Sequence, residues 1–72
     1  MKRFKLAVFR IRHELKQHEI AKKLGISTSH YAAIENGIAD PSYKILVKFD
    51  DVFKDEKLDV FDIFKKEERK AE

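Results

Sequence analysis

The sequence predicts a small all-α domain. Apolar residues recur at the three- and four-residue spacings of amphipathic helices, and no stretch shows the two-residue alternation of a strand. The two glycines and the one proline stand between these periodic stretches, where helices begin or end. With 72 residues and an apolar share of 43%, the chain can fill one core. Together these observations favour a compact bundle of about five short helices.

The first helix is predicted over residues 5–14. Leu6, Phe9 and His13 share one face at spacings of three and four residues. The neighbouring face is apolar too, which is more apolar surface than one buried stripe needs. We expect the surplus to pack against the C-terminal segment or against a second copy of the chain.

Two short helices follow, and a glycine ends each of them. The second helix is predicted over residues 17–24, and Gly25 follows it where a helix terminus requires positive φ. Ser27 is a favourable N-cap for the third helix, which is predicted over residues 28–36. Gly37 then ends the third helix as Gly25 ends the second.

A fourth and a fifth helix complete the predicted fold. Asp40 is expected to cap the fourth helix, and Pro41 is expected to be its first residue. The apolar residues of this helix continue to Phe53 at spacings of three and four. Asp59 is a candidate cap for one or two final turns.

Charge is divided unevenly along the chain, although the net charge is only +3. Residues 1–48 hold ten Lys and Arg against four Asp and Glu, whereas residues 49–72 hold six against nine. A basic front half suits a protein that faces a polyanion with one side, although solvated helix surfaces would also account for it. Segment 65–72 has no apolar run, so we expect a disordered tail beyond a domain of residues 1–64.

The composition also argues against several functional classes. The chain has no cysteine, and its three histidines are five and twelve residues apart, so no metal site is predicted. No Gly-rich phosphate loop or nucleophile motif is present, which argues against an enzyme or a cofactor. No apolar run approaches the roughly 20 residues of a membrane span, and no signal-peptide pattern is present. A cytoplasmic location is therefore expected.

Residues in and around the turn after the second helix meet the requirements of a helix-turn-helix. The small side chain of Ala21 lets the third helix cross the second closely. Gly25 allows the sharp turn, Ile26 can insert into the core, and Ser27 can cap the third helix. Few other motifs need all of these residue types at this spacing.

The run LKQHEIAKKLGISTSHYAAIENGIADPS, residues 15–42, resembles the Cro/repressor-type (xenobiotic-response-element-type) DNA-binding domain of phages and bacteria. The matching residues are Leu15, Gln17, Ile20, Ala21, Leu24, Gly25, Ile26, Ser27, Ile34, Glu35, Asn36, Gly37, Pro41 and Ser42. The resemblance covers roughly residues 4–64. It implies a lambda-repressor-like bundle that binds double-stranded DNA and regulates transcription, most often as a repressor.

The resemblance also implies roles for individual residues. The positions that point into the major groove, where bases are read, are Thr28, Ser29, Ala32 and Ala33. The positions that meet phosphates are Gln17, Ser27, His30, Asn36 and Lys44. Arg10 and Glu35 are expected to form an internal ion pair that joins the first helix to the end of the third. Because the base-reading positions hold no Arg, Lys, Asn or Gln, modest selectivity per base is predicted.

Two features depart from the family pattern. Lys16 stands where the family usually has a Thr or Ser that caps the second helix, and a lysine side chain cannot accept that hydrogen bond. The segment between Phe53 and Phe61 is also a residue or two longer than usual, which leaves the C-terminal packing open.

One domain of this size buries too little surface to bind DNA both tightly and selectively, so a homodimer on a palindromic operator is expected. The apolar residues expected at the dimer surface are Phe53, Val60, Phe61 and Phe64, some of which must also close the core. An alternative is a protein-interaction module or antitoxin-type partner. Such a protein would keep the fold and bind another protein through its acidic C-terminal half.

Overall fold

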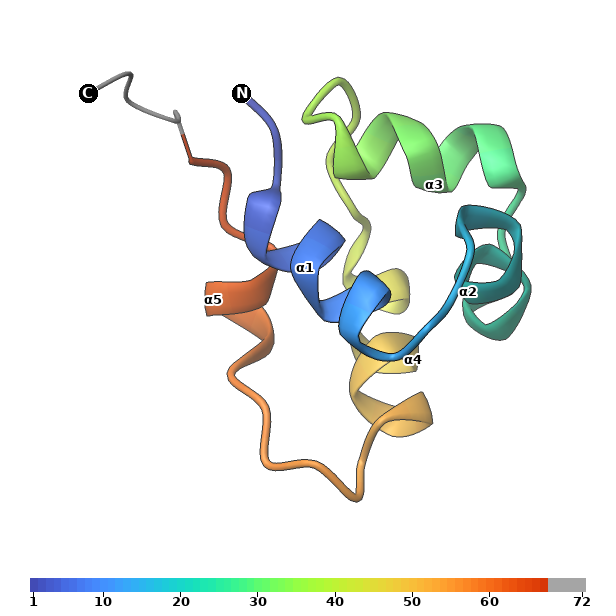
Figure 1. The fold of residues 1–72 in the computed structure, drawn as a ribbon, viewed down its shortest axis with the longest axis vertical. Coiled ribbons are helices and arrows are strands. Elements are labelled where there is room, and N and C mark those ends of the chain that lie inside the picture. The colour runs from blue at the N-terminus through green and yellow to red at the C-terminus, as the bar shows by residue number, and fades with distance from the viewer. Residues whose placement is uncertain (68–72) are drawn as a thin grey trace.

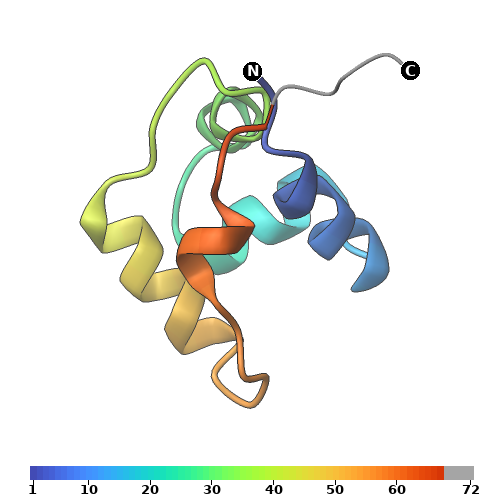
Figure 2. The same ribbon diagram turned by 90° about the vertical axis from the view of Figure 1, so that its left-hand side faces the viewer.

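The computed structural model describes residues 1–67, and the regular structure within them is entirely helical (Figure 1). The helices are α1 (Phe4–Arg12), α2 (Gln17–Leu24), α3 (Thr28–Glu35), α4 (Tyr43–Val52) and α5 (Val60–Ile63). Helix α2 packs against α3 and α4, and α5 lies between α1 and α4 (Figure 2). The predicted all-α class and the order of the five helices are confirmed.

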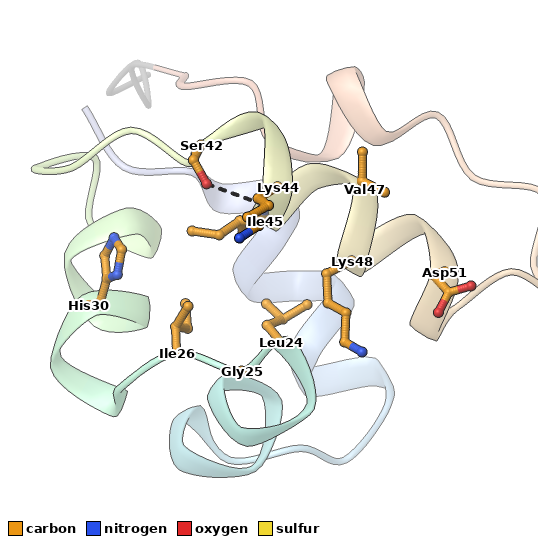
Figure 3. A pocket seen from close by; sticks show the side chains of 10 residues that line it. All are labelled: Leu24, Gly25, Ile26, His30, Ser42, Lys44, Ile45, Val47, Lys48 and Asp51. Carbon is orange, nitrogen blue, oxygen red and sulfur yellow. Dashed lines mark hydrogen bonds between the residues drawn. The ribbon is translucent and has the colours of Figure 1, made fainter.

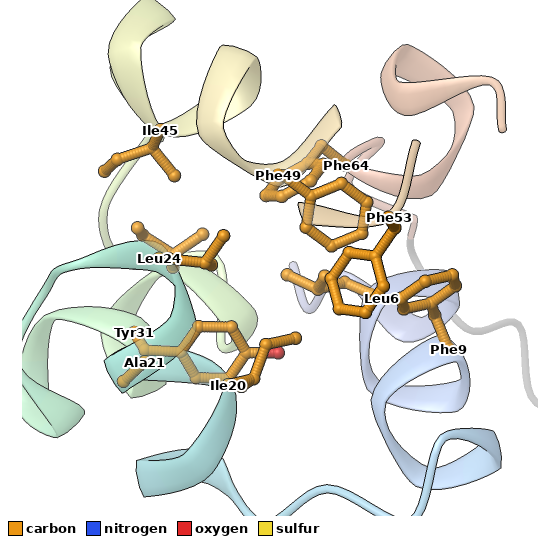
Figure 4. Packing of buried hydrophobic residues seen from close by; sticks show 11 residues of the cluster. Leu6, Phe9, Ile20, Ala21, Leu24, Tyr31, Ile45, Phe49, Phe53 and Phe64 are labelled. Carbon is orange, nitrogen blue, oxygen red and sulfur yellow. The ribbon is translucent and has the colours of Figure 1, made fainter. Parts of the chain in front are cut away.

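The core is organised around an aromatic cluster that joins α1, α4 and the end of α5 (Figure 4). The ring centroid of Phe49 lies 5.1 Å from that of Phe9, and 4.9 Å from those of Phe53 and Phe64. Several of these pairs are tilted or edge-to-face, arrangements that add about 0.5–1.5 kcal/mol per pair to simple burial. The cluster therefore holds the short C-terminal helix in place.

Burial in this cluster corrects part of the predicted dimer surface. Phe53 and Phe64 are only 9% and 7% exposed, because both rings are needed to enclose Phe49. Of the four residues expected at that surface, Phe61 is 81% exposed and Val60 is half-buried.

The ends of α2 and α3 follow the sequence signals. Gly25 adopts φ 74° as the C-cap of α2, and the Ser27 hydroxyl accepts a hydrogen bond from the backbone N–H of His30 at 3.1 Å. Lys16 makes no side-chain cap, but the carboxylate of Glu19 accepts from the backbone N–H of Lys16 at 2.7 Å. One free N–H group at the start of α2 is therefore satisfied without the usual Thr or Ser.

Helix α4 begins later than predicted. Its N-cap is Ser42, whose hydroxyl accepts from the backbone N–H of Ile45 at 3.3 Å, and its first residue is Tyr43. The prediction that Asp40 caps this helix is therefore wrong. The Asp40 carboxylate accepts instead from the guanidinium of Arg3 at 2.8 Å, so it is engaged by the N-terminal segment.

His13 ties the segment after α4 back to α1. The imidazole stacks on Phe9 with a ring-centroid distance of 4.1 Å. Its Nδ1 lies 2.8 Å from the Phe9 carbonyl oxygen, and its Nε2 lies 2.7 Å from the Glu56 carboxylate. The Phe9 carbonyl, and then Glu56, raise the pKa of His13, because both favour the imidazolium form that donates from both nitrogens.

The beginning of the predicted tail packs on the domain. Glu67 donates its backbone N–H to the carbonyl of Lys2 at 3.1 Å, and Lys66 forms an ion pair with Asp40 at 3.2 Å. The rest of that segment, residues 68–72, lies outside the described residues. No helix within residues 1–67 is long and apolar enough to cross a membrane.

We expect stability to fall as the pH rises through the pKa of His13. Folding raises this pKa, so the stabilisation is complete below the ordinary histidine pKa of 6.5 and is lost above the pKa of the folded state. Between about pH 6 and about pH 9 the free energy of unfolding should fall by less than about 1 kcal/mol, since the pair is partly exposed. Urea titrations at several pH values measure this change.

Glu56→Gln is the control for this titration. It removes the carboxylate that faces His13 and keeps the other two histidines, so the fall with pH should be smaller in the variant than in the wild type. An identical pH dependence in both proteins would contradict the role assigned to the His13–Glu56 pair.

Candidate nucleic-acid interface

Helix α3 buries one side and exposes its amino end. Tyr31 and Ile34 are 0% and 1% exposed and anchor the helix in the core. Thr28 and Ser29 are exposed in its first turn. The other two predicted base readers, Ala32 and Ala33, are half-buried further along the helix. The two hydroxyl groups are therefore the most accessible polar groups among the predicted base readers.

The carboxylate of Glu35 organises the other end of α3. It is 2% exposed, yet it accepts two hydrogen bonds from the Arg10 guanidinium, from Nε at 2.9 Å and from Nη2 at 3.1 Å. The Tyr31 hydroxyl donates to it at 2.6 Å, and the Gln17 amide donates at 3.4 Å. Arg10 also donates to the carbonyl of Leu15 at 2.9 Å. One buried carboxylate thus fixes α1, the start of α2 and the end of α3.

The hydrogen bonds keep Glu35 ionised despite its burial. Burial by itself raises the pKa of Glu35, but donation from Arg10 and from Tyr31 outweighs it, so the pKa lies below the usual glutamate range. Burial raises the pKa of Tyr31, and its hydrogen bond to the Glu35 carboxylate raises this pKa further. The pKa of Arg10 is raised by its hydrogen bonds to Glu35. The group therefore stays Arg⁺, carboxylate and neutral tyrosine at ordinary pH.

Four of the five residues predicted to meet phosphates fall into two groups beside α3. The amide of Gln17 donates a hydrogen bond to Glu35 at the carboxyl end of α3. The exposed Asn36 is the residue that follows Glu35. His30 and Lys44 instead line a common hollow between α3 and α4 (Figure 3). The fifth residue, Ser27, uses its hydroxyl to cap α3.

The hollow beside α4 has an apolar floor, and its charged lining residues are Lys44, Lys48 and Asp51 (Figure 3). It measures about 600 Å³, and its floor includes Leu24 and Ile45. The side chains of Lys44 and Lys48 on its rim make no ion pair with any described residue. Both lysines are exposed, so their charges are available to an anion at this edge of the domain.

Arg3 is an important residue that the sequence reasoning did not single out. It is only 3% exposed, and its guanidinium donates to the carbonyls of Ile34, Ala39 and Phe64 as well as to Asp40. Its sequence setting is one basic residue among several near the N-terminus, and no spacing marks it. Its role is apparent only from hydrogen-bond partners that are distant in the sequence.

Within residues 1–67, no group of three or more His, Cys, Asp or Glu could hold a metal ion.

Comparison with known proteins agrees with this geometry. A model of the helix-turn-helix family matches residues 6–61. Over 57 residues the chain is 42% identical to an uncharacterised HTH-type transcriptional regulator of Methanocaldococcus jannaschii, and the match covers 68% of this chain and 86% of that protein. No solved structure matches the chain.

Glu35→Gln is expected to lower the free energy of unfolding by about 2 kcal/mol, since hydrogen bonds to charged groups contribute roughly 1.5–3 kcal/mol. The variant keeps the shape of the side chain but leaves the Arg10 charge uncompensated. Chemical denaturation measures the loss.

Asp62→Asn is the matched control for Glu35→Gln. It removes one carboxylate from the exposed Lys5–Asp62 pair, whose side chains are 46% and 47% exposed. This change should lower the stability by less than about 1 kcal/mol. Equal losses of unfolding free energy in the two variants would show that the buried Glu35 network stabilises the fold no more than an exposed ion pair does.

Proposed function

Because the chain belongs to the helix-turn-helix family, which confirms the resemblance to Cro/repressor-type domains, we propose that it binds double-stranded DNA and regulates transcription. The observation that carries the proposal is helix α3, which is anchored in the core along one side while its amino end, with Thr28 and Ser29, is exposed. In the proposed complex this end enters the major groove. A chromosomal or phage DNA target would make the cytoplasm the place of action.

Phosphate contacts supply most of the affinity in this proposal. Gln17 and Asn36 would meet the backbone at one end of α3, while His30 and Lys44 would meet it across the hollow beside α4. Lys48, one turn after Lys44 on the same rim, adds a further positive charge. The backbone N–H groups at the starts of α2 and α3 also favour phosphate.

Base reading in this proposal relies on short side chains. The hydroxyls of Thr28 and Ser29 can pair with several base edges, and the methyl groups of Ala32 and Ala33 suit the thymine methyl. We therefore propose modest selectivity per base pair. Repeated contacts in a dimer and the sequence-dependent shape of the DNA would make up the difference.

A second copy of the chain is proposed to cover an exposed apolar face between α4 and α5. Tyr43 and Phe61 are 80% and 81% exposed, and Val47 is 48% exposed. With Val60 they line a hollow of about 520 Å³. An apolar patch of this kind can meet its own copy across a two-fold axis, which would match a palindromic operator. Such a dimer would act as a repressor by excluding polymerase from the operator.

One observation favours an alternative occupant for the same face. The carboxylates of Asp50 and Asp59 stand beside the hollow, so a basic segment of another protein could bind there instead of a second copy. That arrangement corresponds to an antitoxin-type or other interaction module with the same fold. The oligomeric state of the isolated protein distinguishes the two proposals.

Selection from a random double-stranded DNA library tests the proposed function, and a consensus sequence should be enriched. Lys44→Gln should weaken binding to the selected sequence and to unrelated DNA by about the same factor. It should also reduce the slope of log K against log salt by about 1. Thr28→Ala should instead reduce selectivity at one base pair by up to about tenfold. Fluorescence anisotropy measures both changes.

Lys57→Gln is the matched control for Lys44→Gln, because Lys57 is an exposed residue in the segment between α4 and α5. Its loss should change binding only slightly. Absence of any enriched sequence at moderate salt would contradict sequence-specific DNA binding by this chain.

Phe61→Ser is expected to convert a dimer into a monomer without loss of helix content, because the ring is exposed and closes no part of the core. Sedimentation equilibrium measures the mass, and circular dichroism checks the fold. Ile11→Ser, at a 62% exposed position on α1, is the control and should leave the dimer intact. A wild-type protein that is monomeric at high concentration would argue for the alternative occupant.

A further inference from the structure

We infer that Arg3 is a positioning residue for DNA binding, which holds the α3–α4 loop, residues 36–42, so that the phosphate-facing groups on either side of it keep their relative places. The inference rests on the proposed function. It assigns a role to a residue that lies outside the helix-turn-helix and outside the candidate interface.

The guanidinium of Arg3 makes four hydrogen bonds with its five N–H groups. Nη1 donates to the carbonyl of Ile34 at 2.6 Å and to that of Ala39 at 2.9 Å. Nη2 donates to the Asp40 carboxylate at 2.8 Å, and Nε donates to the carbonyl of Phe64 at 2.8 Å. The Arg3 side chain is 4% exposed, and its bonds to Phe64 and Ile34 are buried, whereas the Asp40 carboxylate is largely exposed.

These acceptors belong to three separate parts of the chain. The carbonyl of Ile34 is in the last turn of α3, Ala39 and Asp40 are in the loop, and Phe64 follows α5. Three of the four acceptors are backbone carbonyls, whose directions are set by the course of the chain. A rigid guanidinium can satisfy them together only when the loop has one conformation. Arg3 therefore fixes the path of the loop.

The backbone around Arg3 strengthens this attachment. Its N–H donates to the carbonyl of Glu35 at 2.9 Å, so the N-terminal segment runs along the end of α3 (Figure 2). Gly37 adopts φ 77° directly against this segment, and a Cβ at that position would collide with the carbonyl of Met1. The N-terminal segment thus holds the loop both by hydrogen bonds and by close packing.

The loop separates groups that the proposed complex uses together. Asn36 stands at its start, and Lys44 follows shortly after its end, in the first turn of α4. A change in the path of the loop would move these groups relative to one another and relative to Gln17. Since phosphate spacing along DNA is fixed, such a shift would remove contacts even though every contacting side chain remained present.

Arg3→Lys tests the inference because it keeps the positive charge and loses the planar fork. We expect affinity for the selected DNA to fall about tenfold, as for the loss of one charge-assisted hydrogen bond to phosphate, and the salt slope to fall by about 1. Amide chemical shifts of residues 36–42 should change in the free protein. Arg12→Lys makes the same substitution at an exposed position of α1, and it should change neither affinity nor shifts.

Loss of stability alone would not produce this result. Phe53→Leu weakens the core away from the loop, and binding measured at low temperature, where both variants are folded, should be unaffected by it. An Arg3→Lys variant that keeps the wild-type affinity, salt slope and loop shifts would overturn the inference. Wild-type protein that selects no DNA would contradict the proposed function instead, while the amide shifts would still report whether Arg3 fixes the loop.

If Arg3→Lys fails to fold, a pair of glycine variants tests whether the N-terminal segment fixes the path of the loop. Gly37→Ala crowds the carbonyl of Met1 and displaces the segment that carries Arg3, whereas Gly25→Ala, at nearly the same φ, meets nothing within 4 Å. Both variants carry the strain of a side chain at positive φ. Amide shifts of the loop that change more in Gly37→Ala than in Gly25→Ala, together with weaker DNA binding than the wild type, would support the inference. Loop shifts that are equal in the two variants would overturn it. Binding is compared with the wild type because Gly25 lies in the turn that positions α3.

Discussion

The fold depends most on one buried carboxylate, that of Glu35. Its four hydrogen bonds come from α1, from the first residue of α2 and from its own helix, so the angle between these three helices is set at one point. A buried charge is unfavourable unless it is fully paired, and here every donor is directed at it. Conformations that separate the helices leave this charge unpaired in the interior, which makes them costly. The network therefore favours one arrangement over its close alternatives.

Two arginines of the N-terminal region, Arg3 just before α1 and Arg10 within it, hold the same end of α3. Arg10 binds the side chain of Glu35, while the backbone of Arg3 binds its carbonyl and the guanidinium of Arg3 binds the next carbonyl before it, that of Ile34. The amino end of the helix is held differently, by the Ser27 cap and by Tyr31 in the core. As a result, α3 is fixed at its carboxyl end and exposed at its amino end, which is the end proposed to enter the DNA groove.

Local signals in the sequence predicted the helices well, and long-range partners explain where prediction failed. Gly25 and Ser27 act through neighbours a few residues away, so the turn between α2 and α3 could be read directly. The local sequence around Asp40 was equally typical of an N-cap, but its carboxylate instead accepts a hydrogen bond from Arg3, which is 37 residues away. The sequence also could not divide the phenylalanines between core and surface, because Phe53 and Phe61 differ only in what packs against them. The Arg10–Glu35 pair was expected from the family resemblance, whereas Arg3 matched no pattern.

Short base-reading side chains make the placement of α3 more important. A long glutamine or arginine can adjust its reach by rotating several bonds, but Thr28 and Ser29 have one side-chain torsion each and cannot. Helix α3 has 8 residues and is therefore about 12 Å long, so a tilt of about 5° about its fixed end would move its first turn by about 1 Å. Hydrogen bonds to bases tolerate little more than that before they are lost. In the proposed complex, selectivity would therefore depend as much on the two arginines at the carboxyl end of α3 as on the hydroxyls at its amino end.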